Sequence, residues 1–329
     1  MPKPFRTILP PSEFDFNIHH QNKVISIGSC FAENIGKKMT DLKFDISSNP
    51  FGILYNPISI NTAISHLLDE KIYRPSDLFR HDGLWHSYDH HGKFSKDTQE
   101  ATLRSINEEI KNTATKLRKA DLLILTFGSA FVFEEKKTGR IVANCHKVPQ
   151  KHFSRRRLSP KEIIPPLADT FHRLHAENTS IRILLSVSPV RHFRDGLVEN
   201  NRSKAALHLA VDALVEQFEF VDYFPAYELV MDDLRDYRFF KEDMVHPNDT
   251  AVDYVWEYFA NALFDNKTMD LNIRLEKIAA ALMHRPFNQE SEEYQLFLQK
   301  LSKKIESLER EYGFLDFTRE KEFIERMSV

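Results

Sequence analysis

Gly28, Ser29 and Cys30 stand where an apolar run ends and a helical pattern begins, a position that suits a nucleophile. The glycine permits a sharp turn. The unpaired N–H groups and the positive dipole end of the following helix favour a thiolate and can bind an oxyanion. The three residues are therefore a candidate nucleophile turn. The alternative is an ordinary tight turn with a small buried residue.

Asp243 and His246 lie three residues apart in the stretch EDMVHPN, which precedes another helical pattern. A carboxylate at this spacing can accept a hydrogen bond from one imidazole nitrogen and so fix the tautomer of the ring. The other nitrogen is then free to act as a general base. The same spacing is also typical of a capping aspartate beside a surface histidine.

These candidate groups must be positioned by an alternation of strands and helices. Four apolar runs predict buried strands at residues 23–29, 121–129, 181–189 and 218–226. Helical patterns occupy residues 56–70, 95–120, 159–178 and 200–219. This alternation predicts an α/β fold with a doubly wound parallel sheet. Ligands of such sheets bind beyond the carboxyl ends of the strands, where Gly28, Gly128 and the segment 188–192 are expected.

The character of the chain changes near residue 266, so we expect one domain over residues 1–265 and a helical extension over 266–329. The extension is charged and poor in glycine. One helical face is predicted to be apolar and comprises Leu296, Phe297, Leu301, Ile305 and Leu308. This face should pack on the α/β body, and a homo-oligomer contact through it is the alternative.

Composition excludes several classes of protein. The 329 residues are 42% hydrophobic and 28% charged, and the net charge of -3 gives no reason to expect nucleic-acid binding. Two cysteines are too few for a disulfide scaffold and fit a reducing compartment. Neither a secretory signal nor a membrane helix is evident, so we expect a soluble, cytoplasmic protein with no membrane partner. A metal site would rest only on the 15 scattered histidines, and we expect no metal and no cofactor.

Six motifs follow one another along the chain, namely GSCFAENIG, FGILYNP, LTFGSAFVF, VANCHKVP, SVSPVRH and EDMVHPN. Over roughly residues 5 to 260 they resemble the GSCFA-domain proteins, a group placed beside the SGNH (GDSL) esterases. The resemblance implies a three-layer α/β/α sandwich with a flavodoxin-like parallel sheet. It also implies an esterase or acyltransferase site, and it says less about the substrate.

The resemblance assigns roles to the nucleophile turn and to the terminal motif. Gly28 matches the first glycine of the SGNH pattern, Ser29 falls at its aspartate, and Cys30 falls at its nucleophilic serine. A register slipped by one residue would instead make Ser29 the nucleophile. Asp243 and His246 match the terminal acid–base motif without departure.

The oxyanion site implied by the resemblance is incomplete. Gly52 falls where the superfamily uses a backbone N–H as a donor. After the second strand the chain reads Gly128-Ser129-Ala130, so the usual asparagine donor is missing. Removing one such donor can slow a reaction about 100- to 1000-fold. Asn144 is a candidate replacement from another loop.

Three further groups are candidates for the pocket. Asp89, His90 and His91 lie in the loop WHSYDHHG, which could be a lid or pocket wall, a solvated loop, or, less readily, a metal site. Arg191 and His192 follow the third strand, where an arginine could bind a carboxylate or phosphate or form a surface salt bridge. Cys145 and His146 are adjacent, and we interpret Cys145 as a pocket residue or a buried thiol.

Two functions fit these observations. In the first, Cys30 (or Ser29) attacks a small-molecule or glycan acyl ester or thioester, His246 and Asp243 act as base and acid, and the acyl group passes to water or to an acceptor. In the second, a catalytically degenerate protein of the same fold binds an acylated sugar or peptide. The missing asparagine favours the second function, and the intact Asp243 and His246 favour the first.

Overall fold

A computed structural model of the chain describes residues 6–284 and 286–328, and its centre is a five-stranded parallel sheet. The strands are β1 (Lys23–Gly28), β2 (Asp45–Ser48), β5 (Leu122–Phe127), β9 (Arg182–Val187) and β10 (Val221–Tyr223). Their order across the sheet is β10-β9-β5-β1-β2. Counted along the chain this is 2-1-3-4-5, the flavodoxin-like order. The predicted doubly wound parallel sheet is confirmed, and the short edge strand β2 is an addition to it.

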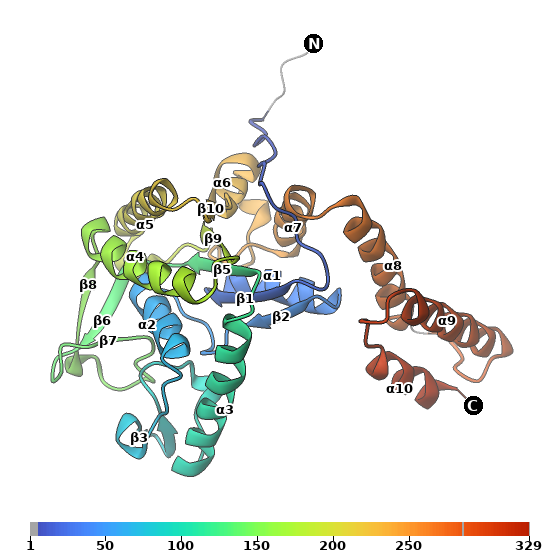
Figure 1. Cartoon of the computed structure of the whole chain (residues 1–329), viewed down its shortest axis with the longest axis horizontal. Helices are drawn as coiled ribbons and strands as arrows, with labels where there is room; N and C mark the ends of the chain where they lie inside the picture. Colours follow the sequence, from blue (N-terminus) through green and yellow to red (C-terminus); the bar gives the residue numbers. More distant parts are fainter. Residues whose placement is uncertain (1–5, 285, 329) are drawn as a thin grey trace.

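Side chains of the central strand β5 alternate between two cores, as the pleat of a strand requires. Leu123, Leu125 and Phe127 join one core, and Leu122 and Ile124 join the other. The first core is covered by α2 (Pro57–Leu68), α3 (Gln99–Leu117), α4 (Pro160–Glu177) and α5 (Leu197–Gln217). The second is covered by α1 (Cys30–Asp41) and α7 (Asp249–Leu263). The three-layer α/β/α sandwich is therefore confirmed, and its layers are visible in Figure 1.

The helices begin where their sequences provide caps. The Asn56 side chain accepts a hydrogen bond from the Ser59 N–H at 2.8 Å, and Pro57 occupies the first turn of α2. Ser159 and Glu162 form a capping box at the start of α4. Within the described residues, no helix combines the length and the apolar character needed to cross a membrane.

Two small antiparallel sheets, which the sequence patterns did not predict, project from the body. One pairs β3 (Phe79–His81) with β4 (Leu84–His86), and the other contains β6 (Phe131–Glu135), β7 (Ile141–Val142) and β8 (Phe153–Arg157). These strands are only two to five residues long, and β8 is basic, so no apolar run marks them. A short helix α6 (Ala226–Glu228) and a π-helical turn (Leu229–Leu234) connect β10 to the Asp243–His246 loop.

The last three helices, α8 (Asn266–Leu282), α9 (Glu292–Glu311) and α10 (Thr318–Met327), extend to one side of the sheet (Figure 1). The buried face of α9 contains Leu298, Leu301, Ile305 and Leu308. Leu296 was expected on this face, but it is 51% exposed because the apolar stripe runs through Tyr294 and Leu298 instead. The Lys43 side chain joins the body to this unit: its Nζ donates to the Asp316 carbonyl at 2.7 Å and lies over the Phe317 ring.

We expect Leu301→Ala to lower the free energy of unfolding by about 2 to 5 kcal/mol, because it leaves a cavity in the core shared by α8 and α9. Leu296→Ala, on the exposed side of the same helix, should change it by about 0.5 kcal/mol or less. Urea denaturation followed by circular dichroism measures both. Equal effects of the two substitutions would contradict the assigned orientation of α9.

Candidate active site

Ser29 and Cys30 lie in the turn between β1 and α1 and differ in exposure and in hydrogen bonding. Ser29 is the N-cap of α1 and is 0% exposed, and its Oγ accepts a hydrogen bond from the Phe31 N–H at 3.3 Å. Cys30 is the first residue of the helix and is partly exposed. Cys30 is therefore partly accessible as a residue, while the neighbouring hydroxyl is enclosed and caps the helix.

Backbone packing at Gly28 fixes this turn. The Gly28 N–H donates to Asn49 Oδ1 at 2.9 Å, and its carbonyl accepts from the Leu54 N–H at 3.0 Å. A Cβ at this position would stand 2.4 Å from the Thr126 carbonyl oxygen of β5. Asn49 is buried and was missed by the sequence analysis, although Asn49-Pro50 directly precedes the FGILYNP motif.

The electrostatic environment of Cys30 contains opposing influences. Burial raises the pKa of the Cys30 thiol, and the Glu33 carboxylate raises it further. The backbone N–H groups of Cys30 and Phe31 and the charge of Lys204 lower this pKa. Burial also raises the pKa of Tyr55, and negative charge on Cys30 adds to that shift, so the two side chains are neighbours.

Lys204 is a residue of the site that the sequence analysis missed. It projects from α5 and is 2% exposed, and its Nζ donates to the carbonyl oxygens of Gly128 at 2.7 Å and Ser188 at 2.5 Å. These carbonyls directly follow β5 and β9. Burial lowers the pKa of Lys204 to about 7. The sequence did contain a signal for it: Lys204 is a single lysine on the apolar face of a predicted helix that also carries Leu207, Val211 and Leu214.

Asp243 and His246 form the hydrogen bond that their spacing allows. His246 Nδ1 lies 2.7 Å from Asp243 Oδ2. Because an ionised carboxylate only accepts, Nδ1 is the donor and Nε2 is left unprotonated in the neutral ring. The backbone N–H groups of Val245 and His246 also donate to Asp243, and these bonds hold its pKa near 2. The pair is a base with a fixed tautomer.

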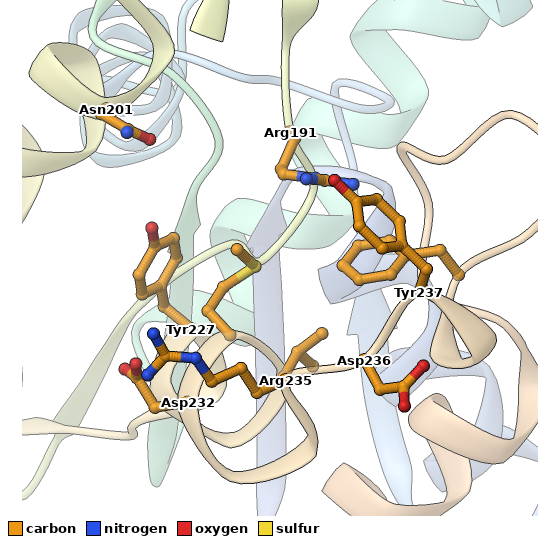
Figure 2. A pocket seen from close by; sticks show the side chains of 10 residues that line it. Arg191, Asn201, Tyr227, Asp232, Arg235, Asp236 and Tyr237 are labelled. Carbon is orange, nitrogen blue, oxygen red and sulfur yellow. The ribbon is translucent and has the colours of Figure 1, made fainter. Parts of the chain in front are cut away.

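Arg191 holds this loop against the end of β9. Its backbone N–H donates to the Val245 carbonyl at 3.4 Å, and its Nη2 donates to the Met244 carbonyl at 2.7 Å. The guanidinium packs over Phe240 at 4.5 Å and beside Tyr237 at 5.3 Å. Figure 2 shows Arg191 and Tyr237 together at one side of a cavity of about 370 Å³. The guanidinium, for which a substrate anion and a surface salt bridge were both open, is thus engaged with a backbone carbonyl and aromatic rings of the protein.

His192 lies next to both halves of the site. Its ring meets Tyr55 edge-on at 5.7 Å, and burial, Lys204 and His246 together lower its pKa to about 4. In the described part of the chain, no hydrogen bond joins Cys30 to His246. The candidate nucleophile Cys30 and the candidate base His246 thus lie at the same edge of the sheet.

The expected oxyanion donors are largely engaged in turns. The Gly52 N–H donates to the Asn49 carbonyl at 2.7 Å, and the Gly128 and Ser129 N–H groups both donate to the Tyr55 carbonyl. Asn144 is not engaged as a donor by its turn, because its Oδ1 accepts from the His146 N–H at 2.8 Å and this bond does not use the Nδ2 hydrogens. The backbone N–H groups that act on the Cys30 sulfur are those of Cys30 and Phe31 at the start of α1.

The WHSYDHHG loop lies mainly in the interior. Asp89 is buried, pairs with Arg140 and accepts from the Tyr73 hydroxyl at 2.6 Å; burial opposes ionisation of Asp89, yet these partners keep its pKa below the usual value. His90 is buried and stacks on Phe51 at 4.6 Å, and burial lowers its pKa to about 3. These two residues therefore pack the interior and are placed neither in a lid nor in solvent.

A second cavity, of about 530 Å³, shares Tyr55 with the surroundings of Cys30. His91, Asn144, Cys145 and Arg194 also line it. His146 is turned away, because its Nε2 lies 2.8 Å from the Ser87 carbonyl. Across the residues that the structure describes, no group of three or more His, Cys, Asp or Glu side chains could hold a metal ion.

Comparison with known proteins assigns the chain to a family. The model of the GSCFA family matches residues 23–259, and the model of the C-terminal domain of GSCFA domain proteins matches residues 275–328. The chain belongs to the GSCFA family. A comparison with curated proteins found no match.

Two solved structures are similar to this GSCFA protein at low identity. One is a carbohydrate esterase family 3 protein from Talaromyces cellulolyticus, with a TM-score of 0.37 and 11% identity, covering 77% of this chain and 99% of the other. The other is an acetyl xylan esterase (Est2A) from the rumen bacterium Butyrivibrio proteoclasticus, with a TM-score of 0.35 and 11% identity, covering 74% and 63%.

We expect Gly28→Ala to lower the free energy of unfolding by about 1 to 3 kcal/mol, because the added methyl group meets the Thr126 backbone and the two strands must separate. Gly92→Ala is the matched control, since a Cβ there has no atom within 4 Å. Its effect should stay within about 0.5 kcal/mol. Urea denaturation compares the two, and an unperturbed Gly28→Ala protein would refute the close packing at the turn.

Proposed function

We propose that this GSCFA protein is an acyl-transfer enzyme that uses Cys30 as its nucleophile on acyl esters or thioesters. The observation that carries the proposal is the contrast at the nucleophile turn. Cys30 is partly exposed at the start of α1, whereas Ser29 is fully enclosed and its hydroxyl is committed to capping that helix. The proposal therefore assigns the attack to the thiol and a supporting role to the hydroxyl.

The chemistry follows from the groups at this edge of the sheet. His246 Nε2 takes the proton from the Cys30 thiol, and Asp243 stabilises the imidazolium that forms. The sulfur attacks the carbonyl carbon, and the resulting oxyanion is bound by the backbone N–H of Cys30 at the start of α1. Collapse of this intermediate breaks the bond to the leaving group, which receives the proton from His246. Water or an acceptor hydroxyl then releases the acyl group and restores the thiol.

Proton transfer in this scheme requires a path for the proton from the Cys30 thiol to His246 Nε2. The side chains of Asp243 and His246 are 48% and 43% exposed, and their loop is held through Arg191 rather than by packing of the imidazole. Movement of this exposed pair toward bound substrate, or one bridging water, completes the contact. The cavity beside Tyr55 provides space for the substrate, and Phe133, Phe153 and Asn144 offer apolar and polar contacts.

A second candidate function is binding without turnover. The separation of Cys30 from His246 and the engaged N–H groups of Gly52 and Gly128 favour it, since each weakens catalysis. Such a protein would hold an acylated sugar or peptide in the same cavity. It would be stabilised by its ligand equally well with and without the Cys30 thiol.

Hydrolysis of p-nitrophenyl acetate by purified variants tests the proposal. We expect Cys30→Ala to reduce kcat/KM about 1000-fold or more, because the nucleophile is lost. His246→Ala should reduce it about 100- to 10,000-fold, the usual contribution of a general base. Ser29→Ala should keep activity within about tenfold and lose about 1 kcal/mol of stability, because it removes only a helix cap.

His19→Ala is the control, since His19 is an exposed histidine that precedes β1 at the opposite edge of the sheet. It should hydrolyse the ester at the wild-type rate. Activity that depends on Ser29 but not on Cys30 would assign the attack to the hydroxyl. Equal activity in all four variants would leave the binding function as the better account.

A further inference from the structure

Lys204 is a buried cation that no carboxylate neutralises. Among the described residues its Nζ has no ion pair, and its hydrogen bonds go to the carbonyl oxygens of Gly128 and Ser188. An ammonium group enclosed to this degree is costly unless an anion or several dipoles compensate it. Two carbonyl dipoles hold the group in place at the carboxyl edge of the sheet but supply no full negative charge.

The groups that surround Lys204 indicate which negative charge could neutralise it. His192, from the loop after β9, and His208, one turn along α5, both have pKa values lowered by burial and by Lys204. The Tyr227 ring centroid lies 6.0 Å from Nζ, and burial raises the pKa of its hydroxyl.

The Gly128 carbonyl that Lys204 binds lies against the nucleophile turn, because a Cβ on Gly128 would stand 3.3 Å from the Ser29 side chain. Cys30 is the next residue of that turn, and its charge also acts on the pKa of Lys204. Negative charge on the Cys30 sulfur is therefore the complement that this turn can supply to the lysine.

We propose that the Lys204 ammonium is the fixed countercharge for the negative charge that forms on the Cys30 sulfur. This inference rests on the proposed function, because it concerns the same thiol. Nζ forms no hydrogen bond with the sulfur in the residues described, so Lys204 is a positioning residue that acts through space. It binds the Gly128 carbonyl, at the end of the strand where the asparagine donor is missing.

The arrangement is suited to a thiol that ionises only during reaction. Burial and Glu33 keep Cys30 protonated at rest, and the charge that forms when a base removes the proton is opposed by desolvation. A cation already locked between two carbonyls stabilises that charge without reorganising. The coupling is mutual, because negative charge on Cys30 raises the pKa of Lys204 against the effect of burial and so favours the protonated amine.

Alkylation of Cys30 by iodoacetamide as a function of pH tests this inference independently of any acyl transfer. The rate at Cys30 is followed by peptide mass mapping in wild type, Lys204→Met and Lys204→Gln. Glutamine can still donate to two carbonyls but is uncharged, so it separates the hydrogen-bonding role from the electrostatic one. We expect both variants to lower the thiolate fraction of Cys30 about tenfold at pH 6, where Lys204 of the wild type is charged, which corresponds to a rise of about one unit in the pKa of the thiol.

Cys145 serves as an internal control in the same digest. Burial raises its pKa to about 11, and the charges that act on it are those of Arg194 and Arg155, so its profile should not change. If Lys204→Met fails to fold, Lys204→Gln still decides, since it keeps the hydrogen bonds. A wild-type Cys30 profile in folded Lys204→Gln would overturn the inference. If the Cys30 profile shifts in the Lys204 variants as expected but the wild-type protein hydrolyses no ester, the proposed function alone is overturned.

Discussion

The close packing of the β1 backbone on β5 at Gly28 is the constraint on which the site depends. No side chain fits between Gly28 and the Thr126 carbonyl, so the two strands approach until their ends coincide. The Asn49 side chain then fixes the Gly28 N–H, and the chain turns directly into α1. Ser29 is consequently enclosed as a cap, and Cys30 is the first residue of the turn that is partly exposed. The contrast between the two residues is thus a consequence of backbone packing.

Charge at the carboxyl edge of the sheet is distributed between a rigid interior and an exposed rim. Lys204 and His192 are held in the interior, where burial lowers the pKa of each. Asp243 and His246 lie on the rim, on a loop tied down through Arg191. Lys204 is thus a fixed group between the ends of β5 and β9, whereas the side chains of Asp243 and His246 are exposed to solvent at the rim.

The sequence predicted the elements that local patterns determine. Apolar runs identified four of the five parallel strands, and their alternation with helices predicted a doubly wound parallel sheet. The flavodoxin-like order of the strands was implied by the motif resemblance and not by the patterns themselves. The three-residue spacing of Asp243 and His246 permitted the hydrogen bond that the structure shows. Motif resemblance led to the family that the comparisons assign.

The sequence patterns could not predict contacts between residues that are far apart along the chain. Asp89 was expected in a lid or pocket wall, in a solvated loop or, less readily, in a metal site. Its partners Tyr73 and Arg140 are 16 and 51 residues away, and no local signal indicates that they enclose it. Lys204 was hidden in a helical pattern, because its acceptors belong to two other elements. The Gly52 N–H could not be known to bond within its own turn, since that bond depends on the left-handed backbone at Asn49 and Gly52.

The most direct test of the account is to locate the acyl group on the protein. Wild type is mixed briefly with p-nitrophenyl acetate and quenched in acid, and the peptide that contains residues 29 and 30 is analysed by tandem mass spectrometry before and after neutral hydroxylamine. The account predicts one acetyl group on Cys30 that hydroxylamine removes, as it does from a thioester, and that is absent in His246→Ala. An acetyl group on Ser29 that resists this treatment, or an unmodified peptide throughout, would contradict it.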